Sequence, residues 1–150
     1  MSPRSRKKSR LLHWRVVLDT NVFLSGVLWP ASAPGRIIRL WKNGHLQLFL
    51  NEDIRKEYLE VLSQFLNQSV LSRWQKWLTH PALISAVHIH LPHYPELRDP
   101  SDNPFLATAV FAQARYLISR DKDLLVLKKF HEVEIVKPEE FIEQYRARRS

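Results

Sequence analysis

Val16-Val17-Leu18-Asp19 is a short apolar run that ends on an acid. A continuous apolar run is typical of a strand that is buried on both faces of a parallel sheet. A carboxylate directly after such a strand lies at the edge where open parallel sheets form their ligand crevice. Asp19 is therefore the first candidate site residue, and an Asx-turn at the strand end is the structural alternative.

Strand and helix patterns alternate along the rest of the chain. We predict strands over residues 15–18, 46–50, 83–89, 116–119 and 133–136. We predict helices over residues 35–43, 51–66, 69–78 and 105–114, a short turn or helix from residue 121, and a last helix from residue 138. Glycine and proline predict loops over residues 19–34 and 90–101. Such alternation predicts an α/β fold with a mostly parallel sheet that helices cover on both faces.

A second candidate acid, Glu57, lies on the predicted helix 51–66. On a helical wheel Glu57 is about 60° from Ile54, at the edge of the apolar stripe, whereas the other acids of this helix lie farther toward solvent. Those other acids are Glu52, Asp53 and Glu60. An acid beside the core-facing stripe can reach an internal cleft; the alternative is a half-solvated glutamate paired with a lysine.

Two further pairs of acids precede helices. Asp99 and Asp102 come before the predicted helix 105–114, where capping explains one acid but not both. Asp102 is closer to the helix and is the better ligand, with Asp99 in a supporting role. Asp121 and Asp123 follow the strand that ends at Ser119, whose hydroxyl faces the same edge. Asp121 is the candidate of this pair and Asp123 a supporting residue; solvated turn acids are the alternative.

Four carboxylates at one edge of a sheet repel one another unless a cation lies among them. The chain has no cysteine, which excludes disulfides, thiolate zinc sites and cysteine catalysis. Oxygen ligands favour a hard divalent ion, Mg²⁺ or Mn²⁺. The pattern therefore predicts metal-assisted phosphate chemistry at Asp19, Glu57, Asp102 and Asp121.

The net charge of +8 is concentrated at the two ends of the chain. Residues 1–15 hold six cations and no acid, and residues 146–150 add three arginines, whereas residues 16–145 hold 14 cations and 15 acids. We predict a basic N-terminal arm over residues 1–14, a globular domain over 15–145 and a basic tail over 146–150. The arm is a candidate RNA-binding segment, and a solubilising tail is the alternative. Its cations before the first strand are Arg4, Arg6, Lys7, Lys8 and Arg10.

The chain has no run of about 18 apolar residues and no uninterrupted apolar segment of a secretory signal, so we expect a cytoplasmic protein without membrane contact. His88, His90 and His93 offer a weaker zinc hypothesis. Trp74 and Trp77 lie three residues apart on one helix, which is typical of packing, with a partner surface as the alternative. No phosphate-binding glycine motif occurs among the three glycines.

Three segments together resemble the PIN-domain family, and in particular its branch of toxin components of toxin–antitoxin systems, which are VapC-like ribonucleases. The three segments are residues 17–22, residues 99–104 and residues 117–125. Residues 52–62 resemble the helix that carries the second acid of that branch, with Glu57 in its place. The resemblance extends over about residues 15–145. Ser119 replaces a frequent threonine, and the basic arm is not part of the family core.

The resemblance implies a compact three-layer α/β/α sandwich and an Mg²⁺- or Mn²⁺-dependent endoribonuclease. It implies that Asp19, Glu57, Asp102 and Asp121 form the catalytic and metal-binding quartet. Asn21 and Ser119 would support the site, and Asp99 would be a branch-specific extra acid. The implied partners are an RNA substrate, a cognate antitoxin that occludes the cleft, and a second copy of the chain.

Two other functions remain open at this point. A non-catalytic RNA-binding PIN module would keep the fold without cleavage, although retention of four acids argues against it. An aspartyl-phosphate phosphatase of the haloacid-dehalogenase type requires a second Asp two residues after the nucleophile, where this chain has Asn21. A receiver-like phosphoacceptor lacks a lysine in a suitable position after a late strand.

Overall fold

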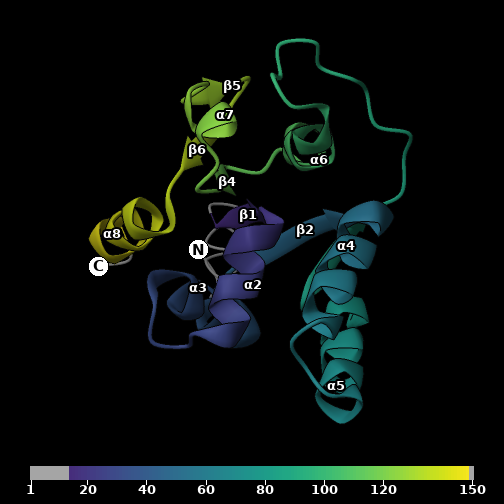
Figure 1. The fold of residues 1–150 in the computed structure, drawn as a ribbon. Coiled ribbons are helices and arrows are strands. Elements are labelled where there is room, and N and C mark those ends of the chain that lie inside the picture. Colours follow the sequence, from purple (N-terminus) through teal and green to yellow (C-terminus); the bar gives the residue numbers. More distant parts are fainter. Residues whose placement is uncertain (1–13, 149–150) are drawn as a thin grey trace, which may run out of the picture.

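A central sheet separates two layers of helices in the computed structural model, which describes residues 14–148 (Figure 1). Within these residues the sheet has six strands in the order β3-β2-β1-β4-β6-β5. The strands are β1 (Arg15–Leu18), β2 (Gln47–Asn51), β3 (Ile84–Val87), β4 (Tyr116–Ile118), β5 (Lys129–Phe130) and β6 (Val133–Val136). All neighbouring strands are parallel except the β5–β6 pair.

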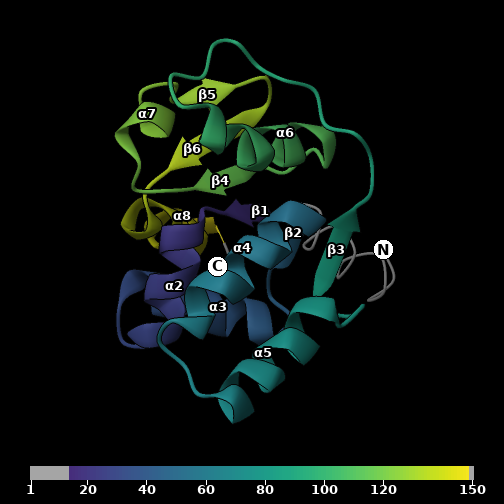
Figure 2. The ribbon, with the colours of Figure 1, turned by 45° about the vertical axis from the view of Figure 1, so that its right-hand side comes forward.

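The helices form one layer on each face of the sheet (Figure 2). One layer consists of α2 (Thr20–Leu28), α3 (Ala33–Lys42), α4 (Glu52–Ser63), α5 (Gln68–Thr79) and α8 (Pro138–Arg148). The other consists of the short η1 (Pro100–Asp102), α6 (Asn103–Phe111) and α7 (Lys122–Leu125). Right-handed crossovers between parallel strands require this division, because the chain runs from β1 to β3 in one direction and then returns past β1 to β4. The predicted three-layer α/β/α class is confirmed. No helix in residues 14–148 is both long and apolar enough to span a membrane.

The strand register brings the carboxyl ends of the parallel strands to one edge. Leu18, the last residue of β1, lies beside Ile118, the last residue of β4. On the other side of β1, Val16 pairs with Leu48 of β2. The order of the sheet reverses at β1, because β2 lies on one side of it and β4 on the other. Ligands of open α/β sheets bind in the crevice at such a reversal.

Aromatic rings fill the core beneath this edge. Phe23 of α2 stacks on Tyr58 of α4 with ring centroids 4.1 Å apart, and Trp41 and Trp74 pack around Phe23. Trp74 is buried, which agrees with the packing interpretation of its helix face. Trp77 packs its edge against Trp74, and the Lys42 ammonium lies 3.8 Å from the Trp77 ring centroid. These contacts fix α2 and α4 relative to each other.

The predicted loop over residues 19–34 is wrong, because most of it is helix α2. Gly26 does not interrupt the helix; it lies where α2 and α3 are in close contact. A Cβ atom built on Gly26 would lie 2.6 Å from the carbonyl oxygen of Pro34 and 2.4 Å from a side-chain carbon of Ile38. The glycine that suggested a break is therefore a packing requirement. Gly44, in contrast, has φ +80° and follows the end of α3, as predicted.

Other element boundaries shift by a few residues. Helix α6 begins at Asn103 rather than at residue 105, and α8 continues to Arg148, so that part of the predicted basic tail is helical. The strand β5 has no counterpart in the prediction. It forms a small hairpin with β6, and Lys128 and His131 at its ends adopt positive φ. Two-residue strands carry too few residues for an alternation pattern to be visible in a sequence.

We predict that Gly26→Ala destabilises the protein by about 1–3 kcal/mol, the usual cost of forcing an extra methyl group into a packed contact. Alanine favours helices, so the loss would come from the clash with α3 and not from helix propensity. Urea unfolding of the variant and of Ser25→Ala, the neighbouring position in α2, would measure the difference. Equal stability of the two variants would contradict the close approach.

Candidate active site

Asp19 is buried at the end of β1, where it occupies the N-cap position of α2. Its carboxylate makes no capping hydrogen bond to that helix, so an Asx-turn does not account for it. Instead, the buried Ser119 Oγ donates a hydrogen bond of 2.7 Å to Asp19 Oδ2. Burial raises the pKa of Asp19; hydrogen bonds from Ser119 and the Thr20 backbone lower it, and the charges of Asp121 and Glu57 raise it further. Asp19 is thus held in place by Ser119 and is surrounded by like charge.

Ser119 also links Asp19 to Asp121. Its Oγ accepts a hydrogen bond of 2.9 Å from the backbone N–H of Asp121. Asp121 is the N-cap of α7, and its Oδ1 accepts a hydrogen bond of 2.9 Å from the backbone N–H of Asp123. One oxygen of Asp121 therefore caps α7, and the other oxygen makes no capping hydrogen bond. The Asp123 carboxylate lies 4.0 Å from the Arg98 guanidinium.

Asp102 is the most perturbed acid of the set. It is 5% exposed, and its Oδ2 is buried without a hydrogen-bond partner among residues 14–148. Burial, followed by the charges of Asp121, Asp19 and Asp99, raises the pKa of Asp102 to about 7. Asp102 makes no capping hydrogen bond to α6, whereas Asp99 accepts one of 3.0 Å from the Ser101 backbone N–H, which lowers the pKa of Asp99. The two acids thus divide the roles: Asp99 caps η1, and Asp102 makes no capping hydrogen bond and has one buried oxygen without a hydrogen-bond partner among the described residues.

Glu57 approaches the same edge from α4. Its Oε2 accepts a hydrogen bond from the hydroxyl of Thr20, the residue after Asp19. The next residue of the helix, Tyr58, donates its phenolic hydrogen to the carbonyl oxygen of Leu18 at the end of β1. Burial raises the pKa of Tyr58, and the charges of Asp19 and Glu57 raise it further. Glu57 therefore lies within electrostatic range of Asp19, although its side chain is exposed.

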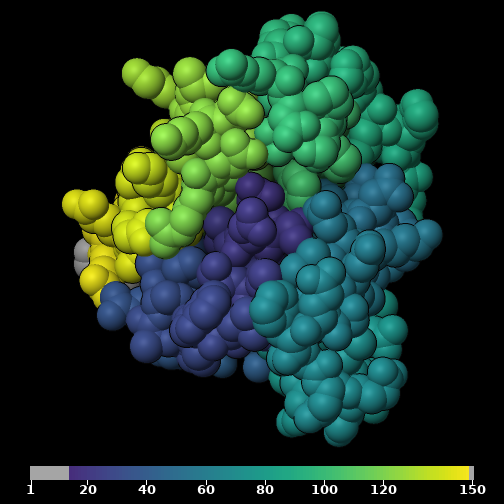
Figure 3. All heavy atoms as spheres, in the orientation of Figure 1, coloured from purple at the N-terminus to yellow at the C-terminus, as the bar shows by residue number. Residues whose placement is uncertain are grey.

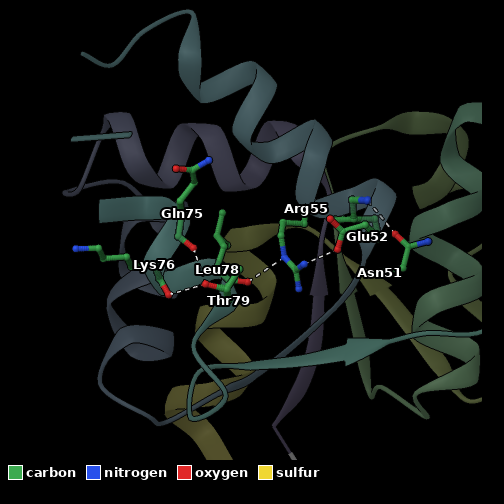
Figure 4. Close-up of polar contacts among 8 residues, drawn as sticks. Asn51, Glu52, Arg55, Gln75, Lys76, Leu78 and Thr79 are labelled. Atoms are coloured by element: carbon green, nitrogen blue, oxygen red, sulfur yellow. Dashed lines mark hydrogen bonds and ion pairs between the residues drawn. The ribbon is translucent and has the colours of Figure 1, made fainter. Parts of the chain in front are cut away.

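Glu52, another acid of α4, is bound by a residue of its own helix. Figure 4 shows the Arg55 guanidinium between the Glu52 carboxylate and the carbonyl oxygen of Leu78, to which Arg55 Nε donates at 3.1 Å. Glu52 is thus engaged in tying α4 to α5. Glu60 is exposed and has no ion-pair partner among the described residues. Among the acids of α4, Glu57 is the one that binds Thr20, and its role in the site stays a prediction.

Other predicted residues are not joined to this cluster. Asn21 is exposed, and its side chain makes no hydrogen bond to the acids within residues 14–148. The cations of the predicted RNA-binding arm lie outside the residues that the structure describes. They are Arg4, Arg6, Lys7, Lys8 and Arg10. His88, His90 and His93 are exposed and belong to no metal-binding group in the described part of the chain, which leaves the zinc hypothesis without support.

The site is not a preformed metal cage. Among residues 14–148, no three His, Cys, Asp or Glu side chains are grouped so that they could hold a metal ion as they stand. The donor chemistry nevertheless fits a hard divalent ion, because all the candidate donors are carboxylate oxygens and Asp102 Oδ2 is buried without a partner. Figure 3 shows the first part of α2, in purple, at the surface between α4 and the segments that follow β3 and β4. The four acids come from these segments.

The model of a protein family described as "PIN domain" matches residues 15–123, which include all four acids. The chain belongs to the PIN-domain family. PIN domains are generally nucleases and commonly depend on a divalent metal. Uncharacterized protein MJ1680 of Methanocaldococcus jannaschii is 29% identical over 150 residues, which cover 93% of this chain and 96% of the relative. No solved structure matches the chain.

Two contacts of this PIN domain were not predicted as such. The hydroxyl of Thr20, the residue after Asp19, binds Glu57. Tyr58 is a buried aromatic residue of α4, and its hydroxyl binds the end of β1. The position of Tyr58 next to Glu57 is the signal that could have linked this helix to Asp19.

The pKa of Asp102 predicts how the stability of the metal-free PIN domain depends on pH. An unfolded aspartate has a pKa of about 4, so between about pH 4 and pH 7 the folded state binds more protons than the unfolded state. Stability should therefore fall as pH rises through this range, and the raised pKa of Asp19 acts in the same direction. Urea unfolding in a chelator from pH 4 to pH 8 would measure this decline. Asp102→Asn should flatten it, whereas Glu143→Gln, an exposed acid on α8, should leave it unchanged. An equal decline in Asp102→Asn would contradict this assignment.

Proposed function

We propose that this PIN domain is a metal-dependent endoribonuclease that hydrolyses RNA phosphodiester bonds and acts as the toxin of a toxin–antitoxin system. The observation that carries the proposal is Asp102, a buried carboxylate with a pKa raised to about 7 and an oxygen without a partner. A buried acid that repels three neighbouring acids costs stability unless a cation compensates it. Such a site is suited to binding a metal ion rather than to supporting the fold.

The residues that would hold Mg²⁺ or Mn²⁺ are Asp19, Glu57, Asp102 and Asp121. A divalent ion at such a site lowers the pKa of water and neutralises charge on a phosphate. Ser119 fixes one oxygen of Asp19, and Thr20 fixes one oxygen of Glu57. These hydrogen bonds hold the carboxylates in place before a substrate arrives, which preorganises the site. By the resemblance to the PIN-domain family, the expected products of hydrolysis carry a 5′-phosphate and a 3′-hydroxyl.

RNA is the proposed substrate because of the resemblance to ribonucleases of the PIN-domain family. A strand of phosphates needs positive charge to approach an acidic edge. Metal ions at the four acids would supply part of that charge. The basic N-terminal arm would supply more, with an attraction that weakens as salt increases. The toxin role, the antitoxin partner and a homodimer rest on the resemblance of the acid-bearing segments to the toxin branch.

We predict that the full chain cleaves single-stranded RNA in Mn²⁺ or Mg²⁺ and that a chelator stops cleavage. Asp19→Asn and Asp102→Asn should each reduce the rate at least about 100-fold, because each removes a charged ligand of the metal. Glu143→Gln is the matched control and should retain full activity. Gel analysis of 5′-labelled RNA would follow the products. Metal-replete protein that binds diverse RNAs and leaves them intact would favour the non-catalytic RNA-binding module.

The metal itself can be tested without activity. A ligand that binds only the folded state raises its stability by mass action. Mn²⁺ at neutral pH should therefore raise the unfolding midpoint of the wild type and not that of Asp102→Asn.

The choice of Glu57 over its neighbours on α4 is tested by a pair of substitutions. Glu57→Gln should lose most of the activity, because it removes a charge beside Asp19, whereas Glu60→Gln should not. Both positions are exposed on the same helix, so their effects on folding should be similar. Cleavage rates at saturating Mn²⁺ would decide between them. Full activity of Glu57→Gln combined with loss in Glu60→Gln would overturn the assignment.

A further inference from the structure

A groove lies at the carboxyl ends of β2 and β3 and reaches the start of α6, directly after Asp102. It consists of two adjoining hollows with volumes of about 280 Å³ and about 240 Å³. Both hollows are lined by Asn51, Asp53 and Ile89. His88 lines the first hollow and His90 lines the second. Neither histidine has a role in the function proposed above.

The groove is connected to the acid-bearing segments through the residues that line it. Asn103, which follows Asp102, lines the second hollow together with Pro104. On the sheet, Asn51 lies at the end of β2, the strand next to β1 and Asp19. A chain of nucleotides whose phosphate is at the acids would therefore place an adjoining nucleotide in this groove.

The walls of the groove are held by hydrogen bonds. Asn51 Oδ1 accepts a hydrogen bond of 2.8 Å from the Ile54 backbone N–H, and this bond caps α4. Figure 4 shows Asn51 at the start of this helix. Asn103 Oδ1 accepts a hydrogen bond of 2.8 Å from the Tyr94 backbone N–H. Its Nδ2 donates a hydrogen bond of 2.9 Å to the carbonyl oxygen of Pro92. The side chains on both walls are thus already engaged. A preformed groove loses little entropy when it binds.

The groups that remain available suit a base and not a phosphate. Among residues 14–148, no lysine or arginine lines either hollow. The His88 and His90 rings are exposed, and Ile89 is 44% exposed, so a planar ring has flat and apolar surfaces to stack on. The Asp53 carboxylate has no hydrogen-bond or ion-pair partner within residues 14–148, whereas Glu52 is bound by Arg55. Asp53 is therefore a free acceptor beside a stacking surface.

We propose that this groove binds a guanine of the RNA substrate, in the nucleotide next to the phosphate that is cleaved. The Watson–Crick edge of guanine carries two adjacent N–H donors, N1–H and the N2 amine, which match the two oxygens of one carboxylate. Adenine, cytosine and uracil each present one donor group with an acceptor beside it. The inference rests on the proposed function for the identity of the ligand as RNA. It adds a base preference and assigns it to Asp53, with His88 and His90 as the stacking surface.

Binding of a set of short RNAs tests the proposal. The probes are oligouridine strands that carry one guanine at successive positions, with Ca²⁺ in place of Mg²⁺ so that binding is measured separately from cleavage. In the wild-type chain one position of guanine should strengthen binding roughly tenfold, the size of one base contact. Asp53→Asn should abolish that preference. His88→Ala and His90→Ala should weaken binding of any base at the same position.

The controls are Glu60→Gln, another exposed acid of α4, and His93→Ala, an exposed histidine that does not line the groove. Both should keep the guanine preference, and thermal unfolding would show that all variants fold. Absence of any guanine preference in the wild type, or its survival in Asp53→Asn, would overturn the proposal. Cleavage in Mn²⁺ is measured on the same RNAs, so a chain that prefers guanine but cleaves nothing would refute the nuclease and leave the groove standing.

Discussion

The hydrogen bond from Ser119 to Asp19 joins the ends of two strands that are 100 residues apart in the chain. It lies where the order of the sheet reverses, so the segments that follow the strands diverge on either side of it. The parallel pairing of β1 with β4 brings the two residues together, and Asp121 follows from Ser119 through the backbone. Asp102 and Glu57 are then added by helices on opposite faces of the sheet. The acidic edge is thus a product of topology before it is a product of individual side chains.

A group of buried and half-buried carboxylates works against folding. The pKa values of Asp19 and Asp102 are both raised, first by burial and then by their acidic neighbours. A protein selected for stability alone would replace such residues with apolar or neutral ones. Their retention in a PIN domain, a family of nucleases, is consistent with a site that functions with a bound cation.

Much of this arrangement could be predicted from the sequence, because strand ends and helix starts fix where a side chain lies in a parallel sheet. Asp19, Asp102 and Asp121 were chosen by that rule, and Glu57 by its place on the helical wheel; their role in a metal site stays a prediction. The rule fails where a glycine has a tertiary role: Gly26 suggested a loop, yet it allows α2 and α3 to touch. It also fails for hydroxyl groups, since nothing in the pattern indicates that Thr20 binds Glu57 and not Asp19. The groove at His88 and His90 combines residues from three separate segments, and only the folded chain brings them together.

Tyr58 has a consequence for how this protein can change over evolutionary time. Its ring stacks on Phe23 in the core, while its hydroxyl binds the residue before Asp19. A substitution that repacks the core around Phe23 will therefore move the end of β1, and with it the acid on which the site depends. Substitutions in the core around Phe23 and substitutions in the site are therefore not independent of each other. Homologues that differ at Phe23 should carry compensating changes at position 58, so the two positions should covary even though neither contacts a substrate.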